Sequence, residues 1–302
     1  MFRKTFFLFI GFIFPLFAMS QMMNVKDVDL KRFMSSKLYV VMDENPFSDF
    51  NASISECLQL HWKLIPYEII DAKKFASLRT NPEFSFMFVS MAEVTQTKTS
   101  LFPSNTLLFK NKMSSRFVVL NISMGDKSGN IQRMPEIISV PLSYYFEVDE
   151  DDDDTEDPEY GYKLGAIIKS MAYVIEKKES QPSLNIEREI KSYMSEVKNY
   201  ELWLLSSDLP ENFQNVQNIS KIYPHKVKIV TQEEIEQAIK TSMKNVAILH
   251  KIGPEDYPLK DVYCFKTLIS VEDGKPLCFD YHTITNQKSD AFLKEDFENL
   301  LK

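Results

Sequence analysis

The chain has 302 residues, of which 44% are hydrophobic and 26% charged, a composition typical of a folded globular protein and not of a disordered or collagen-like chain. It contains only seven glycines, and none of them forms GxGxxG or GxxxxGK[ST], which excludes the two commonest glycine-rich phosphate-binding motifs. A formal charge of −8 without a basic cluster argues against nucleic acid as a partner, and we expect no cofactor.

The first twenty residues have the pattern of a secretory signal peptide. Arg3 and Lys4 precede the apolar run Phe6–Phe17, and Ala18-Met19-Ser20 supplies small residues for a cleavage site. The run is shorter than the roughly 20 residues of a membrane-spanning helix. We therefore expect a mature chain that begins near Gln21 and has no stable membrane span; the alternative is an N-terminal anchor that is never removed.

Export would permit disulfides, but the cysteine positions do not favour one. Cys264 and Cys278 lie on the two strands of a predicted hairpin that turns at Asp273-Gly274. A two-residue turn would place Cys264 opposite Thr283, with Cys278 on the other face and about five residues out of register. We expect reduced thiols.

Most of the chain consists of two similar copies, with a spacing near 160 residues. Each copy has an opening helix, three strands separated by helices, a β-hairpin and a closing amphipathic helix. In the first copy these elements are the helix Val25–Met34, the strand and loop Lys37–Pro46, a helix with Ile54, Cys57, Leu58 and His61 on one face, the strand Tyr67–Asp71, the helix Ala72–Leu78, the strand Phe84–Val89, the hairpin strands Arg116–Met124 and Ile137–Ser143, and a closing helix with Leu164, Ile167, Ile168, Met171 and Ile175 on one face.

The second copy repeats this order. Its hairpin contains an Asp-Gly dipeptide, which favours a tight turn. Its elements are the helix Leu184–Val197, the strand and loop Glu201–Pro210, a helix with Val216, Ile219, Ile222 and Tyr223, the strand Val227–Thr231, the helix Gln232–Thr241, the strand Asn245–His250, the hairpin strands Val262–Val271 and Leu277–Thr283, and a closing helix with Phe292, Leu293, Phe297, Leu300 and Leu301.

This order predicts an α/β fold with some α+β character: two mixed-sheet domains in tandem, each roughly α-β-α-β-α-β-β-hairpin-α. We assign residues 1–20 to the signal peptide, 21–181 to the first repeat and 182–302 to the second. The alternative is a single larger α/β domain. The signal and the repeat together resemble uncharacterised exported proteins of Gram-negative bacteria with a duplicated α/β domain, which implies a periplasmic or extracellular location.

A polar loop follows the first strand of each copy: Asp43–Phe50 in the first and Ser206–Phe213 in the second. Right-handed crossovers place both at the carboxyl ends of parallel strands, where α/β sheets usually bind ligands. The candidate ligand-binding residues are Asp43, Glu44, Asp49, Asp208 and Glu211. The alternative is a solvated loop in which Asp49 or Asn51, and Asp208 or Asn215, cap the following helices.

The run Glu147–Asp157 holds nine acids in eleven residues and no base. It is an acidic insertion in the first repeat, and Asp149, Asp151 and Asp153 are candidate ligands of a cation. Without a glycine it does not match an EF-hand loop, so a self-repelling loop is the alternative. Aromatic residues on both sides of the run could form a stacking platform or pack where it leaves the domain (Tyr144, Tyr145, Phe146, Tyr160, Tyr162).

Histidine, cysteine and serine motifs give no catalytic assignment. The histidines are His61, His225, His250 and His282, and none forms HxxxH or HExxH, so we expect no metal site. His61 and His225 precede the second strand of each copy, which favours a structural role. No GxSxG motif is present.

Duplication without catalytic motifs favours an exported binding or interaction module, with a protein or a small molecule as its unidentified partner. One alternative is a hydrolase-type enzyme whose site lies at the carboxyl ends of the strands, in the Asp43–Phe50 loop or near His250 and His282. Another is a cation-responsive protein that works through the acidic run.

Overall fold

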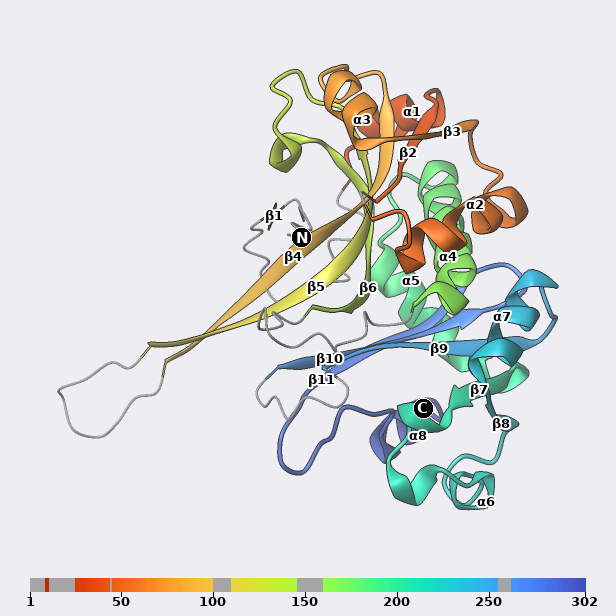
Figure 1. Cartoon of the computed structure of the whole chain (residues 1–302). Coiled ribbons are helices and arrows are strands. Elements are labelled where there is room, and N and C mark those ends of the chain that lie inside the picture. Colours follow the sequence, from red (N-terminus) through yellow and green to blue (C-terminus); the bar gives the residue numbers. More distant parts are fainter. Residues whose placement is uncertain (1–8, 11–24, 44, 100–109, 146–159, 255–261) are drawn as a thin grey trace.

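A computed structural model describes residues 9–10, 25–43, 45–99, 110–145, 160–254 and 262–302 (Figure 1). These residues form two mixed sheets with helices on their faces. The predicted signal peptide, apart from residues 9–10, and the acidic run lie outside the described residues.

The first sheet, sheet A, has five main strands in the order β3-β2-β4-β5-β6. β2 pairs in parallel with β3 and β4, while β5 is antiparallel to both β4 and β6. A two-residue strand, β1, pairs in parallel with β4. The strands are β1 (Phe9–Ile10), β2 (Leu38–Val41), β3 (Tyr67–Ile70), β4 (Ser85–Thr99), β5 (Lys110–Met124) and β6 (Glu136–Tyr144).

The second sheet, sheet B, repeats this topology. Its order, β8-β7-β9-β10-β11, has the same parallel and antiparallel neighbours. The predicted duplication into two similar α/β halves is confirmed. The strands are β7 (Glu201–Leu205), β8 (Val227–Val230), β9 (Val246–Ile252), β10 (Tyr263–Ser270) and β11 (Pro276–Thr283).

The helices also correspond between the halves. Asp71 caps α3 and Thr231 caps α7 at equivalent positions, because each side chain accepts a hydrogen bond from a backbone N–H in the first turn. The helices are α1 (Asp27–Met34), α2 (Asp49–His61), α3 (Ala72–Leu78), α4 (Gly161–Ser180), α5 (Ile186–Tyr193), α6 (Val216–Ile219), α7 (Gln232–Lys240) and α8 (Lys294–Asn299), with 3₁₀ turns at η2 (Ile131–Arg133), η3 (Met194–Asn199), η4 (Ser206–Asp208) and η5 (Glu211–Phe213).

Strand alternation divides the core into layers. Leu38 and Val40 of β2 face the core shared with α1, α2 and α4, while Val41 packs with Phe75 of α3 on the other face. In sheet B, Leu202 and Leu204 likewise pack with α8, and Trp203 and Leu205 with α7.

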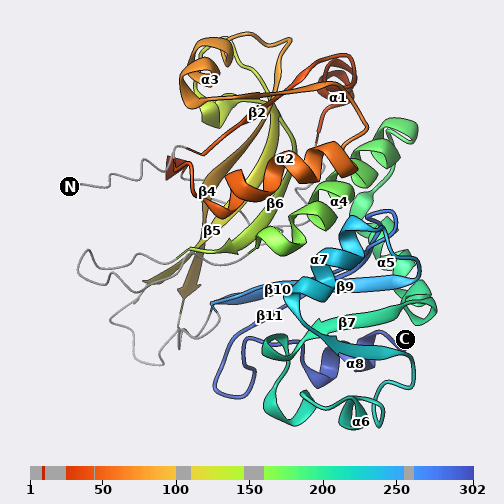
Figure 2. The ribbon, with the colours of Figure 1, turned by 45° about the vertical axis from the view of Figure 1, so that its right-hand side comes forward.

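Helix α4 lies between the two sheets (Figure 2). Its Ile167 packs in the core of the first half, while Ala166 packs in the core of the second. A Cβ at Gly165 would come within 2.8 Å of Ile239 and 2.9 Å of the His61 ring, so a glycine is needed where α2, α4 and α7 meet. His61 therefore has a packing role there, and burial, with nearby Lys169, lowers its pKa to about 4.

Polar contacts also join the halves. Lys169 of α4 donates to the carbonyls of Ile239 and Val271 at 3.3 and 2.7 Å, and burial lowers its pKa to about 8.

A buried histidine makes a second contact between the halves. His250 of β9 is buried, and its Nε2 lies 2.8 Å from the carbonyl oxygen of Pro141 in β6. Because a carbonyl only accepts, Nε2 carries the proton, and burial lowers the pKa of this ring to about 3.

Several of the sequence-based boundaries differ from the structure. β4 continues to Thr99 and β5 begins at Lys110, well beyond the predicted ends, so both strands have 15 residues. The predicted helix around Val216–Tyr223 is reduced to α6, and α8 is shorter than its amphipathic pattern indicates.

The hairpin register also differs. A bulge between Leu268 and Ile269, with a turn longer than two residues, places Cys264 opposite His282 and Cys278 opposite Leu268. The two cysteines therefore share a face, four residues apart, and not opposite faces as predicted. This separation is still beyond disulfide reach, and both thiols are reduced.

The buried His250 predicts a stability loss in mild acid. Between pH ~6.5 and 3 its proton binds only to the unfolded chain, so stability falls as the pH falls through that window. We expect wild type to lose about 2 kcal/mol more than His250→Gln between pH 7 and pH 5, measured by urea unfolding at both pH values. Equal losses in the two proteins would contradict this account.

Candidate functional site

The two carboxyl edges predicted to bind ligands differ in structure. In each sheet the parallel strands end at one edge, and the loops that follow β2 and β7 lie there. The edge of sheet B is covered by the chain's own C-terminal segment, residues 284–302, which we call the closing segment. The loop at the edge of sheet A presents an exposed aromatic residue.

Three buried charges join the closing segment to sheet B. Lys251, near the end of β9, has its Nζ 3.2 Å from Asp290 Oδ2 and 3.8 Å from Asp208 Oδ1. The side chains of all three are at most 11% exposed. Asp208, proposed from the sequence as a ligand residue, is thus a partner of Lys251.

Backbone contacts complete this closure. The Phe292 N–H donates to the Asp208 carbonyl at 2.7 Å. A Cβ at Gly253 would lie 2.0 Å from Asp290 Oδ1, so the glycine leaves the space that the Asp290 carboxylate occupies. The segment after β11 therefore crosses the edge where a ligand of sheet B would bind.

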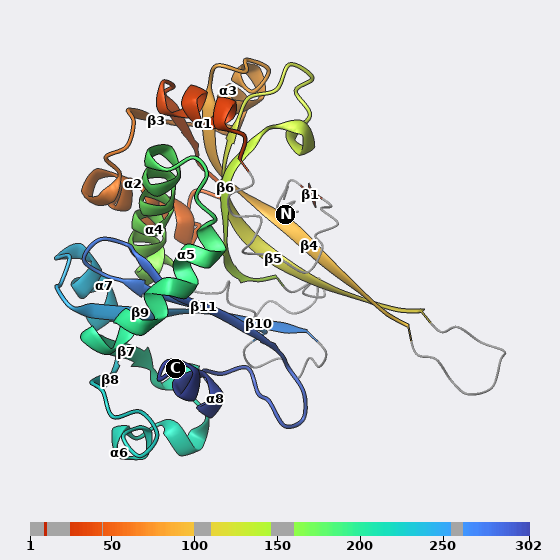
Figure 3. The same ribbon diagram turned by 180° about the vertical axis from the view of Figure 1, so that it is seen from behind.

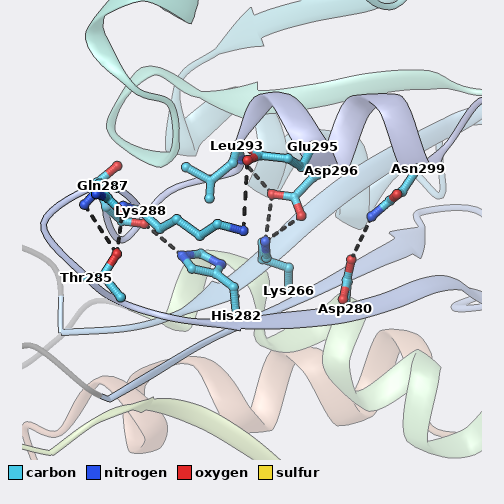
Figure 4. A network of polar contacts seen from close by, with 11 residues as sticks. Lys266, Asp280, His282, Thr285, Gln287, Lys288, Leu293, Glu295, Asp296 and Asn299 are labelled. Carbon is cyan, nitrogen blue, oxygen red and sulfur yellow. Dashed lines mark hydrogen bonds and ion pairs between the residues drawn. The ribbon is translucent and has the colours of Figure 1, made fainter.

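A second buried ion pair anchors α8 (Figure 4). Lys266 Nζ lies 2.5 and 2.6 Å from the two carboxylate oxygens of Asp296, which also accepts the Leu293 N–H at 2.5 Å. Lys266 stands directly opposite Lys251 on the neighbouring strand. The two positive charges therefore lie side by side in the sheet. In the closing segment, Asp290 pairs with Lys251 and Asp296 pairs with Lys266.

Groups near this network are poorly suited to nucleophilic catalysis. Burial, followed by the Asp290 carboxylate, raises the pKa of the Cys264 thiol, and burial raises that of Cys278 to about 12, so both stay protonated. Burial and nearby Lys266 lower the pKa of His282, whose Nε2 lies 2.8 Å from the Ser289 carbonyl. Register places His282 and His250 on opposite faces of sheet B, so they do not form one site.

The loop after β2 is fixed by Asn51 at the first edge. The Asn51 side chain accepts the Asp43 N–H at 2.8 Å and donates to the carbonyls of Asp43 and Asn45 at 2.9 and 2.7 Å. Asp43 Oδ1 accepts the Asn45 N–H, and Asn45 Oδ1 accepts the Phe47 N–H. These bonds tie the described residues of the loop, 43 and 45–47, to the first turns of α2.

Phe47 projects from this fixed loop with 88% of its surface exposed, against 59% for Val28, the next most exposed large apolar residue described. An exposed phenylalanine on a mobile loop would be unremarkable, but here the backbone on both sides is fixed by side-chain hydrogen bonds. The loop therefore holds an aromatic side chain in solvent at the carboxyl edge of sheet A.

A long β-ribbon leaves the same edge. β4 is parallel to β2 but pairs with it only over Ser85–Met87, then continues to Thr99 with β5 alongside. Figures 1 and 3 show this ribbon projecting from the body.

The predicted site residues are only partly brought together. Asp43 is half-buried at the first edge, Asp208 is buried at the second, and Glu211 is exposed on η5. Glu44, the side chain of Asp49, and Asp149, Asp151 and Asp153 lie outside what the structure describes. Phe47 was missed, because a single aromatic residue in a polar loop carries no signal in the sequence.

The capping alternative is correct for one residue. Asn215 caps α6, but Ser48, not Asp49 or Asn51, caps α2. Asp208 caps no helix, because its side chain is directed to Lys251.

Two of the aromatic residues beside the acidic run, and His225, have packing roles. Tyr144 is buried against Phe117, with ring centroids 5.0 Å apart, and Tyr160 is also buried. His225 packs edge-on against Tyr223.

Metal ligation and a small cavity between the halves bear on what the described residues could bind. Within them, no three His, Cys, Asp or Glu side chains are grouped as a metal ion would require. A cavity between the halves, lined by Ile167, Met171 and His250 among others, measures about 20 Å³, room for one water. In the part of the chain that the structure covers, no helix has the length and apolarity to cross a bilayer.

Comparison of the chain with protein-family models, curated proteins and solved structures finds no match.

The Lys266–Asp296 pair predicts a large destabilisation when one partner is removed. Asp296→Asn leaves a buried lysine without its counter-charge, so we expect a loss of about 3 kcal/mol. The control is Glu187→Gln, which breaks the exposed Lys191–Glu187 pair and should cost less than about 0.5 kcal/mol. Urea unfolding measures both, and equal costs would mean that Asp296 does not anchor α8.

The Asn51 network predicts that its loss loosens the loop. In wild type the peptide bond after Phe47 should resist chymotrypsin, because cleavage needs an extended, mobile backbone. Asn51→Ala should raise the cleavage rate about tenfold at that bond, as seen by mass spectrometry of the fragments. An unchanged rate would show that other contacts fix the loop.

Proposed function

We propose that the protein is an exported interaction module that binds a protein partner at the carboxyl edge of sheet A. The observation that carries this proposal is Phe47, 88% exposed on a loop whose ends Asn51 ties to α2 by hydrogen bonds. Export is inferred from the signal-like residues 1–20.

A fixed, exposed aromatic residue suits protein recognition. Burial of a phenylalanine side chain in a partner's apolar pocket contributes roughly 2–3 kcal/mol. Because the loop is already ordered, little conformational entropy is lost when Phe47 is buried. Aromatic anchors of this kind commonly dominate the binding energy of protein interfaces.

The contrast between the edges supports this location. Sheet B has the same strand order, but Asp208, Lys251 and Asp290 bind its closing segment to the equivalent edge. A duplicated fold with one covered edge leaves the other for a partner. Asp43, in the same loop as Phe47, favours a partner with a basic group near its pocket.

Capture from the native cell envelope tests this function. Purified tagged protein should retain a stoichiometric partner that Phe47→Ala loses by at least about tenfold, since about 2 kcal/mol of apolar burial is removed. Thermal unfolding should be unchanged, because 88% of the Phe47 side chain is exposed.

The matched control is Val28→Ala, which removes an exposed apolar side chain from α1. It should retain the partner as wild type does. Equal capture by wild type and Phe47→Ala, or equal loss in both variants, would overturn the proposal.

A further inference from the structure

The two halves meet around His250, in a region that we call the joint, where α4 and β6 of the first half face β9 of the second. His250 is 2% exposed, and its Nε2–H donates to the Pro141 carbonyl of the other half. Its Nδ1 is buried and has no hydrogen-bond partner among the described residues. A second proton on this ring would therefore be a buried charge whose Nδ1–H has no acceptor.

The groups that face His250 offer this charge no counter-ion. Side chains from α4, α5, β6, β10 and β11 line the small cavity beside the ring, and none of them titrates; they include Ile138 and Val140 of β6, Ser170 and Met171 of α4, Ile190 of α5 and Thr267 of β10. The charge that acts on the ring is the Lys163 ammonium of α4, which opposes protonation. The joint therefore accommodates His250 only as the neutral imidazole.

Other polar contacts across the joint also come from positive groups. Lys163 donates to the Lys251 carbonyl at 3.4 Å, and Lys169 donates to the Val271 carbonyl at 2.7 Å. Both donors lie on α4, the last helix of the first half, and both acceptors lie in the second half. Acid leaves these two lysines charged and adds a further positive charge at His250.

Each half has a core of its own that does not depend on the joint. The cluster that contains Leu202 and Leu249 is built from second-half residues, and the cluster that contains Phe86 is built from first-half residues. Apolar contact between the halves includes Phe117 against Phe265, with ring centroids 5.5 Å apart. Opening of the joint would break this contact and leave both of those cores in place.

We propose that acid separates the two halves at the joint while each sheet stays folded. In the separated chain His250 meets water and its pKa returns to ~6.5, against about 3 in the joined chain. The ratio of separated to joined chains therefore rises about tenfold for each pH unit between ~6.5 and 3. His61, with a pKa of about 4 where α2, α4 and α7 meet, acts in the same direction.

Small-angle X-ray scattering and far-UV circular dichroism of the full chain, followed together from neutral to acid pH, test this proposal. The radius of gyration should increase at a pH where the circular dichroism still has its neutral-pH value, because the halves part before their sheets unfold. Loss of both signals at the same pH would overturn the proposal, as would a radius that stays constant until the circular dichroism changes.

Non-titrating variants assign the effect to His250. His250→Gln keeps an N–H donor for the Pro141 carbonyl but takes up no proton, so its expansion should begin about one pH unit or more below that of wild type. His225→Gln is the matched control, because it removes a second-half histidine that packs on Tyr223 in the core of that half. This control should expand at the wild-type pH.

Expansion of His250→Gln at the wild-type pH would overturn the assignment. Circular dichroism at neutral pH first checks that the variant folds. If it does not, His250→Phe, which keeps an aromatic ring without a titrating nitrogen, supplies the same comparison. The wild-type order of expansion and unfolding tests the separation of the halves without any variant.

Discussion

Lys251 and Lys266 stand opposite one another on adjacent strands inside sheet B, and their charges must be neutralised there. Two like charges in a buried sheet would repel and would each lose hydration. Asp290 and Asp296, both in the last thirteen residues of the chain, supply the counter-charges. The closing segment is therefore bound to the carboxyl edge of sheet B, and this requirement distinguishes the two halves.

The consequence is an asymmetric molecule built from a symmetric pattern. The halves share strand order, and α4 packs on both, with Gly165 allowing the close approach of α2 and α7. Yet one carboxyl edge is covered by the chain's own residues, while the other holds Phe47 and the base of the ribbon. Among the described residues, the edge of sheet A is therefore the one with features suited to a partner.

Hydrophobic alternation predicted most of the fold. Strands such as β2 and β7 bury alternate residues on each face, and this period is visible in the sequence. The outer parts of β4 and β5 were missed because residues 93–99 and 110–115 are mostly polar and carry no clear hydrophobic period. The hairpin register was wrong because a bulge at Leu268 has no distinct residue pattern.

The site was less predictable than the fold. Loop position at the strand ends correctly singled out Asp208 and Asp43 as residues of the two edges. Their roles depend on contacts with residues far along the chain, such as Asp290, or on local hydrogen bonds such as those of Asn51. One sequence cannot show that a lysine on β9 recruits an aspartate 39 residues later.

The most direct test compares the two equivalent edges in one experiment. A photo-crosslinking amino acid is placed at position 47 in one variant and at position 211, on the exposed second loop, in another, and both are irradiated in the native envelope. A discrete protein adduct at 47 and none at 211 is the predicted result. An adduct at 211 alone, or equal adducts at both positions, would contradict the assignment of the binding edge.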